Sequence, residues 1–236
     1  NQFVNDEIYH IVSRGIDDNL IFKDANDYYR MIFSIYEFNN ANPVTIQRQR
    51  NARNSFKKEN RGRASIIPML DERENLVEIL SFCFMPNHIH LLLKQIENNG
   101  ITKFMTKVGT GYAGYFNRKY QRKGYVFQNR FRDVHIKSDD QLKTIFNYIH
   151  CNPVSLIEPG WKELGVKNIK KVKHFLENKY RWSSYFDFIN KKNFPSVTKR
   201  DFMLEFMGGS QGCKESVKSW IDYKKDLNQF PEILLD

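Results

Sequence analysis

The chain has 236 residues, of which 41% are hydrophobic and 14% aromatic, so it can bury a sizeable core in one or two domains. No apolar run approaches the ~18 residues of a membrane span, and the first residues carry no secretion signal. The three cysteines form no CxxC pair, which argues against a disulfide framework or structural zinc site and favours a reducing compartment.

Positive charge is the first indication of function. The chain has a net charge of +10, and much of the excess lies in two windows. Residues 47–63 contain seven basic side chains and one acidic one, and residues 103–137 contain nine and one. Such clusters, interleaved with Tyr, Phe and Asn, suit a phosphate backbone and stacked bases, although a generic solvated basic face is the alternative. Residues 47–63 show no apolar period, so we expect a basic insertion or arm at about 41–70.

Hydrophobic periodicity predicts seven elements in the order β-α-β-β-α-β-α. They are strand 7–15, helix 24–38, strand 77–85, strand 88–94, helix 101–124, strand 125–137 and helix 139–152. This order predicts an α+β fold of the ferredoxin-like split β-α-β type, an antiparallel sheet with helices packed mainly on one face. We expect residues 1–153 to form this core and residues 154–236 a mostly helical extension, with helical patterns near 181–190 and 214–227.

The most informative motif is Met-Pro-Asn-His-Ile-His. On a strand, His88 and His90 point to the same face, where two imidazoles can share one metal ion. The alternative is a pair of structural histidines, because a bare His-x-His is common. A metal site would need a third ligand from elsewhere in the chain.

The helix at 139–152 offers that ligand. At ~100° per residue, Tyr148 and Asn152 lie one turn apart on one flank of its apolar stripe. The Asn152 amide could bind a hard cation such as Mg²⁺ or Mn²⁺, with zinc as an alternative. Asn152 also has a purely structural interpretation, since Asn before Pro is common at a helix end. His150 lies on the opposite flank and is interpreted as structural or as a surface group.

Four motifs together resemble the HUH-type single-tyrosine transposases, in particular the REP-associated tyrosine transposase branch. They are FxxMPNHIHLLL, FNRKYQRKGYVFQNRF, NYIHCNPV and YRWSSY. The resemblance implies that His88 and His90 bind the divalent metal, that Tyr148 is the nucleophile and that Asn152 is the third ligand. The alternative nucleophiles are Tyr112, Tyr115 and Tyr120, of which the first two lie on an apolar stripe.

The resemblance also implies a reaction and a partner. A family member cleaves and rejoins single-stranded DNA near hairpins through a 5′-phosphotyrosine, with Mg²⁺ or Mn²⁺. We expect backbone contacts from Arg14, Arg118, Lys119, Arg122, Lys123, Arg130 and Arg132. His10 could face the same substrate or be structural.

Two other functions stay open at this point: a non-catalytic hairpin-binding protein derived from a transposase, and a phosphodiesterase that uses water. The oligomeric state, monomer or homodimer, is open too. The expected location is the bacterial cytoplasm, at the nucleoid, without a membrane partner.

Overall fold

The computed structural model describes residues 3–45, 51, 54–56, 58, 71 and 73–222. The strands are β1 (Ile8–Arg14), β2 (Val77–Met85), β3 (His88–Gln95) and β4 (Arg132–Ile136). The longer helices are α1 (Ala25–Glu37), α3 (Gly100–Lys119), α4 (Asp139–Cys151), α6 (Ile169–Asn178), α8 (Arg200–Met207) and α9 (Gly209–Asp222). Short helical segments are η1 (Ile16–Asp18), η2 (Asn152–Leu156), α5 (Trp161–Leu164) and α7 (Tyr185–Phe188).

The four strands form one antiparallel sheet in the order β2-β3-β1-β4. The two-residue break at Pro86–Asn87 turns β2 back onto β3, whereas α1 and α3 make the two crossovers. This is the topology of the predicted split β-α-β unit, so the α+β fold class is confirmed.

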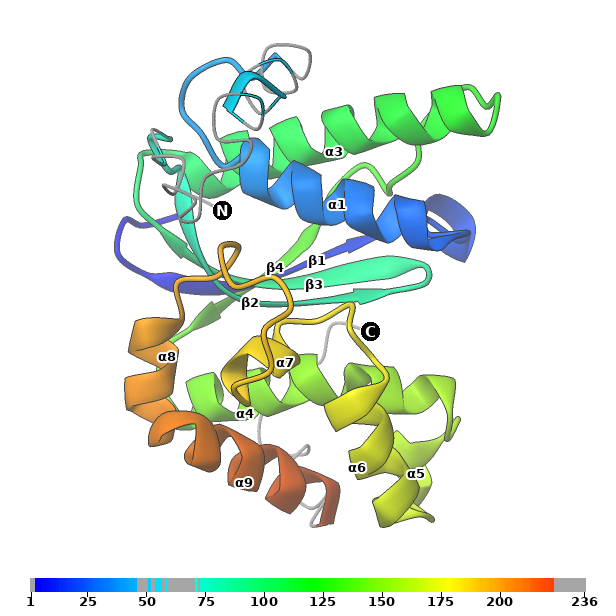
Figure 1. Cartoon of the computed structure of the whole chain (residues 1–236), viewed down its shortest axis with the longest axis vertical. Helices are drawn as coiled ribbons and strands as arrows, with labels where there is room; N and C mark the ends of the chain where they lie inside the picture. Colours follow the sequence, from blue (N-terminus) through cyan, green and yellow to red (C-terminus); the bar gives the residue numbers. More distant parts are fainter. Residues whose placement is uncertain are drawn as a thin grey trace.

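Helices cover both faces of this sheet (Figure 1). The two crossover helices, α1 and α3, share one face, packed over Ile89, Leu91 and Leu93 of β3, whereas packing of the core helices mainly on one face was expected and α4 lies on the other. The other face carries α4 and the C-terminal helices, which pack around Leu92. Both faces of the central strand β3 are therefore largely buried, and the mostly helical extension supplies the second layer that a doubly covered strand requires.

The strand predicted at 125–137 is shorter than expected. Only Arg132–Ile136 joins the sheet, and the residues before it cross the end of β1. There the Ile16 amide donates to the Val126 carbonyl, and the Gln128 amide donates to the Arg14 carbonyl. Val126 is buried in the core below α3, so its apolar character serves packing rather than a continuous ladder.

The YRWSSY segment ties the extension to the edge of the sheet at β2. The Phe84 amide donates to the Trp182 carbonyl, and the Ser184 amide donates to the Phe82 carbonyl. Residues 182–184 therefore pair with the edge of β2, and the helix expected at 181–190 is confined to Tyr185–Phe188. Pairing along an exposed strand edge satisfies backbone groups that would otherwise face another chain.

The predicted basic insertion, about 41–70, lies mostly outside the described residues. Cys83, Cys151 and Cys213 are all buried and free, in agreement with the expectation that no disulfide forms. Within the described part of the chain, no helix is both long and apolar enough to cross a membrane.

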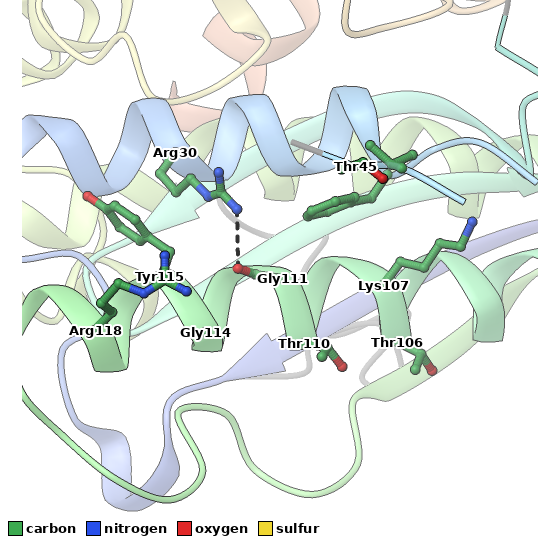
Figure 2. A pocket seen from close by; sticks show the side chains of 11 residues that line it. Arg30, Thr45, Thr106, Lys107, Thr110, Gly111, Gly114, Tyr115 and Arg118 are labelled. Atoms are coloured by element: carbon green, nitrogen blue, oxygen red, sulfur yellow. Dashed lines mark hydrogen bonds between the residues drawn. The ribbon is translucent and has the colours of Figure 1, made fainter. Parts of the chain in front are cut away.

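One of the three glycines in α3 has a packing reason. A Cβ on Gly111 would lie 2.2 Å from the buried Phe38 ring, whereas Cβ atoms on Gly109 and Gly114 would meet nothing within 4 Å. Gly111 lies where α1 and α3 approach, and the Arg30 guanidinium donates to its carbonyl at 3.3 Å (Figure 2). The residue thus allows the two helices to contact each other at this point.

We expect Gly111→Ala to destabilise the protein relative to Gly114→Ala by about 1–3 kcal/mol, because the added methyl overpacks the Phe38 site. Gly114→Ala itself should stabilise by up to ~1 kcal/mol through helix propensity. Urea unfolding of both variants measures the difference. Equal stabilities would show that Phe38 moves aside without cost.

Candidate active site

The register of the sheet gathers the predicted metal ligands on the face that α4 covers. His88 pairs with Arg14, and His90 pairs with Val12, two residue pairs further along β1 and β3. His10, two residues before Val12, therefore points to the same face as both histidines. His10, for which the sequence left a substrate contact and a structural role open, therefore lies within the histidine cluster.

Tyr148 packs directly on this cluster from α4. Its ring centroid lies 5.6 Å from that of His90 and 6.0 Å from that of His10, both edge-on. The rings of His88 and His90 are 4.8 Å apart. Asn152 follows one turn after Tyr148 and is 2% exposed. The structure therefore brings together four residues that are distant in sequence and that the motifs singled out.

Burial keeps the two histidines of the motif neutral. Desolvation lowers the pKa of His88 to about 2, with help from His90, Arg14 and Lys162. Desolvation also lowers the pKa of His90 to about 3. A neutral imidazole keeps one lone pair, which is the form that binds a metal ion.

Burial also raises the pKa of Tyr148 above its usual value of 10.0, and hydrogen bonding to Asn152 and the charge of Arg14 oppose that rise. A second cation stands over the ring: the Lys162 Nζ lies 4.9 Å from the ring centroid and 3.5 Å from the hydroxyl. Burial lowers the pKa of Lys162 to about 8, against the charge of Glu163. Ionising Tyr148 thus depends on the charges around it.

Lys162 was missed by sequence reasoning. It lies in the short helix α5 within the extension, fourteen positions after Tyr148, and no motif surrounds it. Only the fold of η2 and α5 back over α4 brings it to the tyrosine.

The donors fit a divalent ion only as a mixed set. Within the described residues, no group of three or more His, Cys, Asp or Glu side chains is arranged to hold a metal. His88, His90 and Asn152, the ligands expected from the sequence, would form such a mixed set of two imidazoles and one amide. Such a set leaves coordination positions for a phosphate oxygen.

The alternative nucleophiles lie across the sheet, on α3 and its end. The Tyr112 hydroxyl donates to the Ile21 carbonyl in the core. The hydroxyls of Tyr115 and Tyr120 both donate to the buried Asp27, at 3.0 and 2.7 Å. These phenols therefore serve the packing of α1 on α3, away from the histidines.

The predicted DNA contacts divide by position. Arg14 and Arg132 both lie on the histidine face, on neighbouring strands, and Arg14 also pairs with Asp18 at 3.0 Å. Lys119 is engaged by Asp24 and Asp27, at 2.7 Å each, on the α1 side of the sheet. The remaining candidates lie on α3 or in the segment that follows it: Arg118, Arg122, Lys123 and Arg130.

A surface groove of about 900 Å³ runs between α1 and α3 on the opposite face from the histidines (Figure 2). Arg118 lines it, together with Arg30 and Lys107. Lys107 donates to the backbone carbonyls of residues 40–42, and Arg30 donates to Gly111, so both cations hold the helix pair together. These hydrogen bonds favour a structural role for the groove, in the packing of α1 on α3, over a role in anion binding.

The sequence left His150 open as a structural residue or a surface group, and the structure places it in the core. Its ring is fully buried between Phe146, Tyr185 and Phe188, and its Nε2 lies 2.9 Å from the Ser184 Oγ. Burial lowers its pKa to about 3.

This shift predicts acid sensitivity. The unfolded chain protonates His150 below pH 6.5, whereas the folded protein does so only below about 3. The stability present above pH 6.5 is therefore lost as the pH falls, by about 1.4 kcal/mol per pH unit. His150→Phe should remove this share of the pH dependence between pH 7 and 5, whereas His174→Gln, at an exposed site, should not. Denaturant unfolding at each pH checks this; parallel curves for wild type and His150→Phe would contradict it.

Comparison with known proteins identifies the part of the chain that carries this site. Residues 38–152, which include β2, β3 and α4, match the family model described as "Transposase IS200 like". Among curated proteins, none matches the chain. One solved structure, described as the REP-associated tyrosine transposase bound to a REP hairpin, aligns with 85% of this chain and 90% of its own, at 14% identity and a TM-score of 0.45. Residues 38–152, a little under half of the chain, are therefore similar to the IS200-like transposases.

Proposed function

We propose that this protein cleaves and rejoins single-stranded DNA near hairpins, with Tyr148 as nucleophile and with a divalent cation, Mg²⁺ or Mn²⁺, held by His88, His90 and Asn152. The observation that carries the proposal is the packing of Tyr148 on His90, with ring centroids 5.6 Å apart, inside a buried cluster. A purely structural core has no need of two neutral histidines, a phenol and an amide in one place.

The reaction is a transesterification. The Tyr148 oxygen attacks the scissile phosphorus, the bond from phosphorus to the 3′ oxygen breaks, and the proton of the phenol leaves to solvent or a neighbouring base. The products are a 5′-phosphotyrosine and a free 3′-hydroxyl, which takes up a proton. One phosphodiester replaces another, so a second 3′-hydroxyl can reverse the step and join strands without an external energy source. When bound, the cation polarises the phosphate oxygen.

Access to Tyr148 requires a local movement. The residue is 1% exposed, and Lys162 from α5 stands over its ring. A phosphate can therefore reach the phenol only if α5, or the end of α4, shifts. In this proposal the movement opens a path to the phenol and leaves Lys162 beside it.

The DNA strand would approach the histidine face from its margin, where Arg14 ends β1 and the exposed Arg132 begins the edge strand β4. Arg14 and Arg132 lie on that face on neighbouring strands, β1 and β4. Backbone phosphates held by these two arginines would place the scissile bond near Tyr148, because the arginines lie on the same face of the sheet as His88 and His90. The cations of α3 are on the other face and would contact only DNA that wraps around the edge.

The test uses labelled single-stranded oligonucleotides with the hairpins that flank the gene, incubated with the full chain and Mg²⁺ or Mn²⁺. A protein–DNA adduct that survives denaturing electrophoresis is the expected result, and EDTA should prevent it. Tight hairpin binding without an adduct would favour the non-catalytic hairpin-binding function. Cleavage without an adduct would indicate water as the nucleophile.

A further inference from the structure

Each histidine of the motif has a hydrogen-bond partner on the same ring atom. The Nδ1 of His88 lies 2.7 Å from the Asn87 Oδ1. The Nδ1 of His90 lies 3.0 Å from the Nε2 of His10. In both rings the engaged nitrogen is Nδ1, so the other nitrogen, Nε2, points away from the hydrogen-bond partner.

The contact with Asn87 determines a proton position. A neutral imidazole, the form that can bind a cation, has one N–H and one lone pair. An amide oxygen can only accept a hydrogen bond, so the proton of His88 must be on Nδ1. The lone pair of His88 is therefore on Nε2.

The contact between His10 and His90 permits one proton between the two rings. Both side chains are fully buried, and their ring planes differ by only 12°, which limits rearrangement. If His90 donates from Nδ1, its Nε2 keeps the lone pair and can bind a cation. If His10 donates instead, His90 has its proton on Nε2 and cannot bind a cation there.

We propose that Asn87 and His10 are positioning residues, which accept from Nδ1 of His88 and His90 and so present both Nε2 lone pairs to one divalent cation. This inference rests on the metal site of the proposed function, and it assigns a role to two residues outside the ligand set. Outer partners of this kind orient ligating histidines in metal sites.

The fold explains why these two residues are available. Asn87 occupies the two-residue turn between β2 and β3, and its carbonyl accepts from the Gly15 amide at 2.7 Å. His10 lies opposite Leu92, two pairs along from the Val12–His90 pair, so it reaches His90 diagonally across β1 and β3. A shift of one residue in the register of β1 would turn His10 to the other face.

The first test is the tautomer itself, which requires neither metal nor DNA. Nitrogen-15 NMR of the metal-free full chain, with assignments from His88→Gln, His90→Gln and His10→Gln, reports which ring nitrogen carries the proton. We expect Nδ1–H for His88, His90 and His10. An Nε2 proton on His90 would overturn the role of His10, and one on His88 would overturn that of Asn87.

The second test separates positioning from mere packing. His10→Leu fills the site without an acceptor, whereas His10→Gln keeps a carbonyl oxygen near the position of the lost Nε2. We expect His10→Leu to weaken Mn²⁺ binding, measured by calorimetry, by roughly 10- to 100-fold. His10→Gln should restore most of the affinity. Equal Mn²⁺ affinity in folded His10→Leu and wild type would overturn the role.

Asn87 allows the same comparison. Asn87→Asp retains an oxygen that only accepts, and Asn87→Ala removes it. We expect the alanine variant to weaken Mn²⁺ binding by a similar factor and the aspartate variant to keep it. These results are independent of DNA chemistry: a missing covalent adduct would refute the proposed reaction while the tautomers and Mn²⁺ affinities stand, and an Nε2 proton on His90 would refute the inference even if the adduct forms.

Discussion

Tyr148→Phe is expected to abolish the covalent protein–DNA adduct while leaving hairpin binding almost unchanged. The substitution removes one oxygen and keeps the ring that packs on His10 and His90. Because the nucleophilic atom is lost and the fold is kept, both strand cleavage and rejoining should fall below detection. Denaturing electrophoresis measures the adduct, and a mobility-shift titration measures binding.

The matched controls are Tyr115→Phe and Tyr120→Phe. Both lose a hydroxyl that donates to Asp27 on the far side of the sheet, so they should form the adduct at a normal rate. Tyr120→Phe and Tyr115→Phe also test the alternative nucleophiles. An adduct that persists in Tyr148→Phe but disappears in one of these variants would transfer the nucleophile to that residue.

Lys162→Met is expected to slow adduct formation by on the order of 10- to 100-fold. With a pKa of about 8, Lys162 is mostly charged at pH 7. Its Nζ is 3.5 Å from the Tyr148 oxygen, so it favours the phenolate that must form in a site where burial opposes ionisation. Single-turnover rates at saturating DNA separate this effect from weaker binding.

Two variants control for charge. Lys162→Arg keeps the cation and should retain most of the rate. Lys167→Met removes an equal charge at an exposed position of the same segment, so it should change the rate little. If Lys167→Met were as slow as Lys162→Met, the effect would be one of net charge on DNA binding and not of the contact with Tyr148.

The sequence alone determined the architecture of the core. Apolar periodicity located the four strands and the helices α1, α3 and α4, because each strand and helix buries a face of its own with a characteristic period. The signals of His88, His90, Tyr148 and Asn152 are local as well. Two residues two apart on a strand share a face, and two residues four apart on a helix share a flank, whatever the rest of the chain does.

Other features depended on contacts between distant segments. The length of β4 was set by pairing of residues 126–128 with the end of β1, and the conformation of residues 182–184 was set by pairing with the edge of β2. Neither pairing leaves a periodic pattern, because an irregular backbone segment meets its partner only after the sheet has formed.

The surroundings of the candidate site were decided by tertiary structure. His10 reaches His90 because of the register between β1 and β3, and Lys162 reaches Tyr148 because η2 and α5 fold back over α4. The lowered pKa values of His88 and His90 follow from burial, which no residue type states by itself. Sequence thus identified the groups that could react, whereas proton positions and charge states came from packing, because solvation and hydrogen bonding are properties of the folded environment.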